Sequence, residues 1–284
     1  MICDFMIGEL YLVATPIGDM TDIAPRALGI LSTVDIVAVE DKRRSSRLFS
    51  HFGIKTPMIS YHDHSEEKQV KKIIDELLCG KSVALISDAG TPLISDPGYK
   101  LVNAAKDKSI KVSPVPGPCA LIAAISASGL PSDRFIFEGF LPSKSIPRIT
   151  KIQNISADSR TIIFYEAPHR ILETLIDMIK VIGPSRKIVL ARELTKTYET
   201  FISGTLESVL QIIEKDLNQQ KGEIVIVLAG ADSSEKKIET QDSKRILSVL
   251  LEELPLKQAV SLGSKITGIQ KNIFYKLALD LKKQ

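Results

Sequence analysis

The sequence predicts an α/β fold built as two successive halves, followed by a small helical region. Short runs rich in Val and Ile alternate with amphipathic segments through the first part of the chain, which is typical of a parallel sheet covered by helices. A second series of such runs begins after a Pro- and Gly-rich break at 116–118. A polar, lysine-rich stretch then separates both halves from C-terminal residues with leucines at helical spacing.

The first half predicts a largely parallel sheet. Its expected strands are short and apolar, and they lie at 10–15, 35–40, 82–87 and 111–115. The amphipathic segments between them lie around 23–32, 42–52, 66–79 and 98–108. Several strands end in polar residues, at the carboxyl edge where open α/β sheets bind ligands.

The second half predicts a mixed sheet. Its expected strands lie at 135–140, 161–166, 187–193, 198–204 and 223–230. The third and fourth follow each other closely, which favours antiparallel pairing. We therefore expect α/β domains at 8–117 and 118–231, a linker at 232–242 and a small helical domain at 243–284. In that last domain one helix face carries Leu247, Leu250, Leu251 and Leu254.

Composition sets broad limits on location and partners. The net charge of +3 and the pI near 8.6 permit nucleic acid as a partner without demanding it. The three cysteines are far apart and lack metal-ligand spacing, which favours free thiols in a reducing compartment. The first residues carry an acidic Asp4 and no basic region, and no apolar run reaches the roughly 20 residues of a membrane span. We expect a soluble cytoplasmic protein.

Two turns after expected strands are candidate ligand sites. In ATPIGDMTDIAPRAL (14–28), Pro16 and Gly18 shape a turn before a helix that begins near Pro25. This turn is not GxGxxG, which disfavours a dinucleotide site, and it could equally be structural. SDAGTPLISDPG (87–98) holds two Asp, two Gly and two Pro, so its backbone shape is closely specified and its polar groups suit a zwitterion. The alternative is a surface loop in which Asp96 caps the next helix.

Charged side chains follow the second expected strand. Glu40 and Asp41 are adjacent at its end, so they should point to opposite faces, and Asp41 could instead cap a helix. Lys42, Arg43, Arg44 and Arg47 come directly afterwards, and Lys144, Arg148 and Lys151 form a second cationic group. Such groups can bind phosphates, or they can be solvated helix faces.

Two histidine-containing motifs have weaker interpretations. His62 and His64 lack a third ligand at suitable spacing, so we expect no metal site. In FYEAPHR, Glu166, His169 and Arg170 lie between a strand and a helix. They could contact substrate, or Glu166 and Arg170 could simply pair.

Residues 8–231 resemble the tetrapyrrole methylase superfamily of methyltransferases. More narrowly, nine motifs in order resemble the bacterial small-subunit ribosomal RNA (cytidine-2′-O)-methyltransferases: VATPIGDMTDI, VEDKRR, SDAGTPLISDPG, VPGP, SASGLPSDRF, FEGFLPSK, FYEAPHR, ARELTK and KGEIV. The tail also resembles the small helical domain that ends those proteins. Asp19 and Lys42 stand where that family typically has Asn and Thr, which puts the substrate contacts in question.

The resemblance implies two α/β domains with S-adenosylmethionine in the cleft between them. The implied cofactor contacts are Pro16, Gly18, Asp88, Ala89, Gly90, Thr91, Pro92, Ile94, Gly117, Ser126, Phe164 and Tyr165. Phe164 could equally be plain core. An aromatic face such as that of Tyr165 also suits a sulfonium or a flat base.

The implied reaction is methylation of a cytidine ribose in 16S rRNA of the small ribosomal subunit. Glu40 or Asp41 would orient or deprotonate the 2′-hydroxyl. The expected substrate-binding residues are Arg43, Arg44, Arg47, His62, Lys144, Glu166, His169 and Arg170. The family's habit implies a homodimer, and methyl transfer needs no metal. The alternatives are a methylase acting on a tetrapyrrole or a protein side chain, and a non-catalytic RNA-binding assembly factor.

Overall fold

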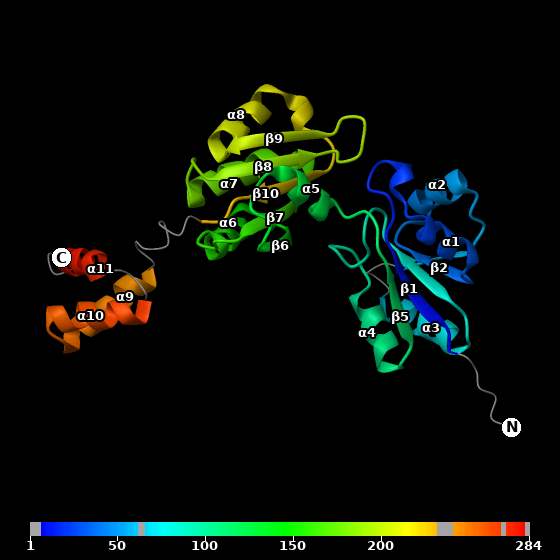
Figure 1. Cartoon of the computed structure of the whole chain (residues 1–284), viewed down its shortest axis with the longest axis horizontal. Coiled ribbons are helices and arrows are strands. Elements are labelled where there is room, and N and C mark those ends of the chain that lie inside the picture. Colours follow the sequence, from blue (N-terminus) through cyan, green and yellow to red (C-terminus); the bar gives the residue numbers. More distant parts are fainter. Residues whose placement is uncertain (1–6, 62–65, 232–240, 268–270, 282–284) are drawn as a thin grey trace. The chain divides into compact units, whose positions relative to one another are not determined.

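The computed structural model describes residues 7–61, 66–231, 241–267 and 271–281 (Figure 1). The described residues form two compact units. The first takes in the chain up to Ile152 and the segment Thr161–Ala229, and the second takes in Gln153–Arg160 and the chain from Gly230.

The first sheet of the larger unit is parallel throughout, as the alternating pattern predicts. Its order is β3-β2-β4-β1-β5. The strands are β1 (Glu9–Val13), β2 (Ile36–Val39), β3 (Met58–Ser60), β4 (Val83–Ile86) and β5 (Lys111–Val115). The edge strand β3 was not predicted, because it has three half-buried residues and therefore no apolar run.

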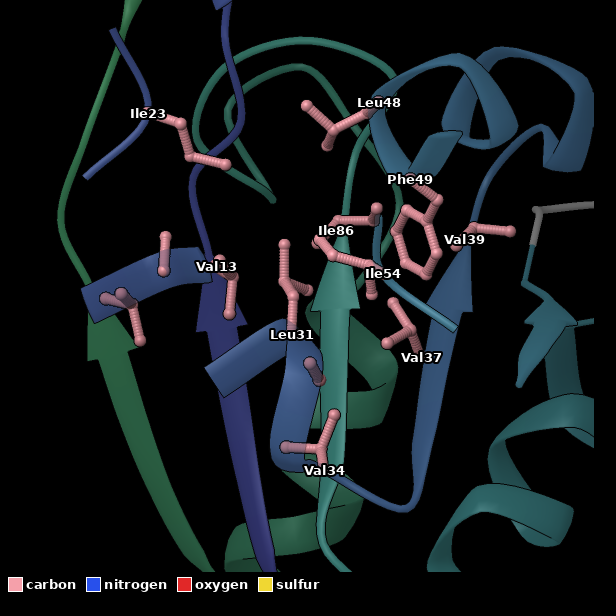
Figure 2. Packing of buried hydrophobic residues seen from close by; sticks show 13 residues of the cluster. Val13, Ile23, Leu31, Val34, Val37, Val39, Leu48, Phe49, Ile54 and Ile86 are labelled. Carbon is pink, nitrogen blue, oxygen red and sulfur yellow. The ribbon is translucent and has the colours of Figure 1, made fainter. Parts of the chain in front are cut away.

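Helices cover both faces of this sheet, so its central strands are apolar on both sides. On one face lie α1 (Pro25–Thr33) and α2 (Lys42–Phe52), which bring Leu31 and Phe49 against Val37 and Ile86 (Figure 2). Pro25 occupies the first position of α1, as expected, where its missing N–H matters least.

The other face of the sheet has a second core. Here α3 (Glu66–Leu78) and α4 (Tyr99–Asp107) contribute Leu77 and Leu101, which pack with Leu10 and Leu85. All four side chains are buried. The strands are therefore held from both sides, and their carboxyl ends form a fixed edge.

The second sheet is mixed, again as predicted. Its order is β6-β7-β10-β8-β9, and only the β6–β7 pair is parallel. The predicted antiparallel pairing of its third and fourth strands in chain order, β8 and β9, is confirmed. The strands are β6 (Phe135–Phe140), β7 (Thr161–Glu166), β8 (Lys187–Arg192), β9 (Thr200–Thr205) and β10 (Ile224–Leu228).

Helix α5 (Ala120–Ser128) packs on one face of the second sheet, where Leu121 and Ala124 contact Ile163 and Val225. The remaining helices associated with this sheet are α6 (Ser145–Ile155), α7 (Ile171–Ile182) and α8 (Leu206–Lys215). Short 3-10 turns lie at Met20–Asp22, Pro168–Arg170 and Leu217–Gln220.

The smaller unit contains three C-terminal helices, α9 (Gln241–Glu253), α10 (Leu256–Thr267) and α11 (Lys271–Leu281). Leu247, Val260, Phe274 and Ala278 form its core. Gly263 allows the close approach of α10 to α11, because a Cβ there would lie 2.3 Å from the ring of Phe274. Most of the predicted linker at 232–242 lies outside the described residues, and its last two residues already belong to α9.

No helix among the described residues combines the length and apolar character needed to cross a membrane.

Candidate active site

A cavity of about 390 Å³ lies in the larger unit, where residues from both sheets meet. This volume is in the usual range for small-ligand sites. The first sheet contributes residues that follow β1, β2 and β4, at the carboxyl edge where a ligand was expected. The lining residues are Ile17, Glu40, Arg44, Asp88, Ala89, Gly90, Thr91, Ile94, Ser95, Asp96, Cys119, Ala120, Phe140, Tyr165, Glu166, Ala167, Pro168, Leu194, Glu223, Ile224 and Val225.

The loop 87–98 forms the central part of this lining. Thr15 and Gly90 exchange two backbone hydrogen bonds, of 2.9 and 3.1 Å, which attach the loop to the end of β1. The Thr91 hydroxyl donates to the carbonyl oxygen of Pro118 at 2.9 Å, which attaches it to the start of the second half. Gly90 has a φ of +86°, which glycine adopts without strain. The loop is therefore fixed by both halves of the unit.

Two residues of this loop hold a left-handed backbone without being glycine. Leu93 has a φ of +71° and Ser95 a φ of +67°. Such conformations cost roughly 1–3 kcal/mol each and concentrate at functional sites. Leu93 and Ser95 lie on either side of Ile94 and precede Asp96. The side chains of Ile94, Ser95 and Asp96 all line the cavity.

Asp96 does not cap the following helix, which excludes the structural alternative for this residue. The N-cap of α4 is Gly98, and no side chain hydrogen-bonds that helix end. Burial raises the pKa of Asp96 to about 6, with further upward shifts from the charges of Glu40 and Asp88 and a smaller lowering by a hydrogen bond with Ser87. This carboxyl therefore titrates close to neutral pH.

The cavity wall is acidic. Of the described residues that line it, five carry a carboxylate and only Arg44 carries a positive charge. Arg44 pairs with Asp88 at 3.0 Å, and the second oxygen of Asp88 accepts a hydrogen bond from the Asp41 amide at 3.1 Å. An acidic wall favours a cationic ligand.

Glu40 and Asp41 are separated as their adjacency at a strand end predicts. Glu40 lines the cavity. Asp41 is the N-cap of α2, and its carboxylate accepts a hydrogen bond from the Arg43 amide at 2.7 Å. Asp41 therefore caps the helix, which is the alternative that the sequence offered for this residue.

An aromatic wall comes from the second sheet. The Tyr165 ring makes edge contacts with Phe137 at 4.8 Å and with Phe140 at 5.7 Å between centroids. A bulge in β6, with Gly139 at a φ of +64°, inserts one extra residue between these two phenylalanines. The Tyr165 hydroxyl accepts a hydrogen bond from the Leu121 amide at 3.2 Å, and burial raises the pKa of this phenol well above its ordinary value.

Glu166 ends β7 at the cavity wall and is almost completely buried. It accepts hydrogen bonds from the Thr174 hydroxyl at 2.7 Å and the Ala167 amide at 2.8 Å, and it pairs with Arg170 at 3.2 Å. Arg170 also donates to the carbonyl oxygen of Leu141. The predicted Glu166–Arg170 pair is therefore present, and it fixes the chain just after Phe140.

Several predicted cofactor residues lie outside the lining. Phe164 is fully buried and points to the opposite face of β7 from Tyr165, so the core alternative holds. Ser126 is exposed on α5, and its hydroxyl donates to the carbonyl oxygen of Ile122. The other predicted residues that do not line the cavity are Pro16, Gly18, Pro92 and Gly117.

Gly18 and Gly117 serve close backbone packing instead. A Cβ at Gly18 would lie 2.6 Å from side-chain atoms of Thr195 and Lys196, and one at Gly117 would lie 3.0 Å from the Cβ of Ala14. The Gly18 turn is also attached to that segment by a hydrogen bond from the Asp19 amide to the Thr195 hydroxyl. Both glycines thus hold the segments that border the cavity.

The two predicted cationic groups differ. Arg43, Arg44 and Arg47 are exposed on α2. In the second group Lys144 is exposed, but Arg148 is 1% exposed and bonded to acidic groups of α7, so interpreting Arg148 as a phosphate contact was wrong. His169 is exposed beside the site, whereas His62 and His64 lie outside the described residues.

The sequence interpretation missed part of the lining, notably Ser95, Cys119, Phe140, Leu194 and Glu223. Four of these five lie inside motifs already singled out by resemblance, since only Cys119 follows its motif VPGP. The motifs therefore located the cavity along the sequence, but they did not show which of their side chains face it.

Among the described residues, no group of three His, Cys, Asp or Glu side chains is placed to hold a metal ion. Cys79 and Cys119 are free thiols.

The fold of this unit is similar to that of several solved structures, among them methyltransferases. Diphthine synthase aligns over 82% of this chain and 92% of its own, with a TM-score of 0.60 and 17% identity. Uroporphyrin-III C-methyltransferase from Thermus thermophilus, complexed with S-adenosyl homocysteine, aligns over 78% and 97%, with a TM-score of 0.54 and 17% identity. These likenesses establish the fold.

Sequence similarity establishes the family. The Tetrapyrrole (Corrin/Porphyrin) Methylases profile matches residues 9–210, and the RsmI C-terminal HTH domain profile matches residues 238–282. The Ribosomal RNA small subunit methyltransferase I of Pseudomonas aeruginosa is 54% identical over 96% of this chain and 97% of its own. Its Escherichia coli O157:H7 counterpart is 48% identical over 96% and 95%. The chain belongs to the tetrapyrrole methylase family.

Proposed function

We propose that this chain transfers the methyl group of S-adenosylmethionine to the ribose 2′-hydroxyl of a cytidine in 16S rRNA. The observation that carries the substrate is the near full-length similarity to proteins named Ribosomal RNA small subunit methyltransferase I. The observation that supports the cofactor is the acidic cavity built on the loop 87–98.

The residues present fit this cofactor. S-adenosylmethionine carries an ammonium and a sulfonium, and the cavity wall carries an excess of carboxylates. Its adenine needs an apolar surface, which Ile17, Ala120, Leu194 and Val225 provide. Tyr165 adds an aromatic face that suits a cation or a base. We propose that Asp88, Ala89, Gly90, Thr91 and Ile94 hold the cofactor beside these residues.

When bound, S-adenosylmethionine supplies a methyl group activated by the sulfonium. The protein's residues then have to align the 2′-hydroxyl with that group and remove its proton. Glu40 remains a candidate for this work because it lines the cavity, whereas Asp41 serves as the cap of α2.

Exposed cations beside the cavity would bind the RNA backbone. Arg43, Arg44 and Arg47 lie on the exposed side of α2, and Lys144 is exposed after β6. The helical C-terminal domain would add contacts through Lys257, Lys265 and Lys271, which are also exposed. Phosphate contacts of this kind make affinity dependent on salt.

We also propose domain boundaries at 8–117, 118–231 and 243–284, with a linker at 232–242. The substrate would be the small ribosomal subunit in the cytoplasm, and the acting species would be a homodimer.

The function is tested by incubating the protein with methyl-labelled S-adenosylmethionine and either assembled small subunits or free rRNA, and then mapping methylated riboses. Label at the 2′-oxygen of one cytidine is the expected result. Label on a tetrapyrrole or on protein, with none on RNA, would overturn the substrate. Binding of RNA without any label would indicate a non-catalytic assembly factor.

Two matched glycine variants make this test specific to the cavity. Gly90 and Gly53 both have positive φ, of +86° and +66°, so Ala strains the backbone at each. A Cβ at Gly90 would lie 3.3 Å from Ile17 in the cavity wall, whereas one at Gly53 would meet open space. Gly90→Ala should lose methylation, and Gly53→Ala should keep it.

A further inference from the structure

We infer that Phe140 is the surface on which the base of the target cytidine stacks while its ribose 2′-hydroxyl reaches into the cavity. This inference rests on the proposed function and names the residue of the same site that holds the base of the substrate. Three observations support it: the exposure of the Phe140 ring, the way its backbone is fixed, and the groups beside it in the cavity lining.

Phe140 is an exposed aromatic ring in the lining of a cavity. It is 54% exposed, although phenylalanine is among the residues most often buried in proteins. The other exposed residues of the lining are Arg44, Ala89, Ser95 and Glu223, which are small or charged. Among the described residues of the lining, Phe140 therefore supplies the large apolar surface that stays open to a ligand.

The ring contact between Phe140 and Tyr165 leaves a face of Phe140 for that ligand. The two rings meet at 5.7 Å between centroids and 64° between planes, which is an edge contact. Such a contact occupies at most one face of a ring. Unpaired RNA bases stack on aromatic faces of this kind, and the stacking tolerates any base. Phe140 would therefore hold the base without reading its identity.

The backbone on both sides of Phe140 is fixed. The bulge in β6, with Gly139 at a φ of +64°, brings Phe140 to the side of Tyr165. Arg170 donates a hydrogen bond to the carbonyl oxygen of Leu141, and the Leu141 side chain is buried. Because the ring is carried on a fixed backbone, little conformational entropy is lost when a base stacks on it.

The groups beside Phe140 suit the rest of a nucleotide. A Cβ at Gly139 would lie 3.5 Å from the Ser95 hydroxyl oxygen, so the end of β6 lies beside the loop 87–98 that would hold the cofactor. Arg44 belongs to the same lining, and its side chain is 69% exposed, so it can meet a phosphate. A nucleotide bound here would have its phosphate at a cation, its base at a ring and its ribose toward the cofactor.

The cofactor needs a different kind of surface. Small-ligand sites bury most of the surface of their ligand. The lining residues Ile17, Leu194 and Val225 are buried and can enclose an adenine in this way. A ring that is more than half exposed instead suits a base whose strand continues into solvent.

The kinetic test compares methylation of small subunits by Phe140→Ala and Phe135→Ala. Phe135 is the matched control, because it lies on the same strand, is 37% exposed and is not among the residues that line the cavity. Phe140→Ala should lower kcat/KM by about 5–150-fold, the range for loss of one stacked base, mainly through a higher KM. Phe140→Tyr, which keeps a flat ring, should recover most of that loss, and Phe135→Ala should match wild type.

Affinity for S-adenosylmethionine separates a base platform from a cofactor contact. Calorimetry on Phe140→Ala should give a Kd within about threefold of wild type, because the surfaces that would enclose the cofactor are unchanged. Size-exclusion chromatography of the same variant should show the wild-type subunit count.

Fluorescence gives a readout that does not depend on methyl transfer. The chain contains no tryptophan, so Phe140→Trp and Phe135→Trp each carry a single indole. A dye-labelled single-stranded oligoribonucleotide is added with S-adenosylhomocysteine until the anisotropy of the dye shows saturation. The bound RNA should quench the tryptophan emission of Phe140→Trp, because a base stacks on the indole, and should leave that of Phe135→Trp nearly unchanged.

Four results would overturn the inference. They are wild-type kcat/KM in Phe140→Ala, a loss of cofactor affinity that accounts for its lost rate, a changed subunit count, which would assign the ring to a second copy of the chain, and equal quenching in the two tryptophan variants. The kinetic comparison uses a wild type that methylates RNA. Failure of the proposed function is distinct, because in that case the wild type labels no RNA.

Discussion

The cationic groups at 42–47 and 144–151 look alike in sequence, but their central arginines differ in structure. On α2, Arg43 and Arg47 are exposed, and Arg44 reaches a cavity carboxylate while its side chain stays 69% exposed. On α6, Arg148 is buried to 1% exposure and bonds Asp177 at 2.8 Å and Glu173 at 3.2 Å. Arg43 and Arg47 are therefore exposed to a phosphate, whereas Arg148 at the centre of the second group is bonded within the protein.

The difference shows that cation clustering identifies a charged segment but not its role. Arg148 also donates to the carbonyl oxygen of Ser143 at 3.2 Å, so its planar fork joins α6, α7 and the preceding loop. Asp177 lies 29 positions further along the chain than Arg148. Nothing local to the segment 144–151 indicates this partner.

The largest effect should come from breaking the buried pair. Arg148→Ala removes both contacts of the guanidinium with the carboxylate of Asp177, which is only 4% exposed. We expect a loss of roughly 3–5 kcal/mol in the free energy of unfolding, measured by denaturant titration. Lys144→Ala, on the exposed part of the same segment, should change it by less than about 0.5 kcal/mol. Equal losses in both variants would remove the distinction between the two groups.

A smaller effect should follow from removing the exposed cations of α2. The double variant Arg43→Gln, Arg47→Gln should bind small-subunit RNA about tenfold more weakly at physiological salt, because each contact with phosphate releases counterions. The slope of log affinity against log salt should fall by about 1 for each arginine. Filter binding over a salt series measures both, and an unchanged slope would show that α2 does not contact the backbone.

Acid should remove the stability that the buried carboxylate of Asp177 contributes. Burial of Asp177 acts to raise its pKa, but hydrogen bonds from Ser145, Arg148 and Lys180 outweigh it, so the pKa is lowered overall. A lowered folded-state pKa contributes stability at pH values above the unfolded value near 3.8, and this contribution is lost as pH falls through the folded value. Unfolding free energies from pH 7 down to 2 should fall less steeply in Asp177→Asn than in wild type. Parallel curves would contradict this account.

The smallest effect on stability should come from the Arg44–Asp88 pair. Because Arg44 is mostly exposed, Arg44→Gln should lower the free energy of unfolding by less than about 1 kcal/mol. It also removes the one cation of the described cavity wall. Cofactor affinity is therefore the more informative measurement, and a stability loss as large as that of Arg148→Ala would mean that the pair is structural.

The fold was largely predictable because its strands are continuous apolar runs. β4 and β10 are buried at every position, and such runs are visible in sequence. The short strand β3 was not predictable, since Met58–Ser60 is only half-buried. The resemblance added the family, whose profile matches residues 9–210.

The site was predictable as a loop but less so as a set of side chains. Asp96 as a helix cap and Asp96 as a cavity residue are equivalent in sequence, and the backbone up to Gly98 decides between them. Phe164 and Tyr165 differ only in which face of β7 they occupy. Such outcomes depend on tertiary geometry that residue types alone do not specify.

The bulge in β6 means that one wall of the cavity depends on a count of residues. From Phe137 to Phe140 the strand advances three positions, while its partner advances two, from Ile163 to Tyr165. In a regular strand, a residue three positions after Phe137 would point to the opposite face of the sheet, so the bulge is what brings Phe140 back to the side of Tyr165. A deletion of the single codon for Gly139 would place Phe140 two positions after Phe137, where a regular strand keeps it on the same face. An insertion of one further residue would instead shift Phe140 out of this alternation, so this cavity wall can be reshaped by insertion rather than by substitution.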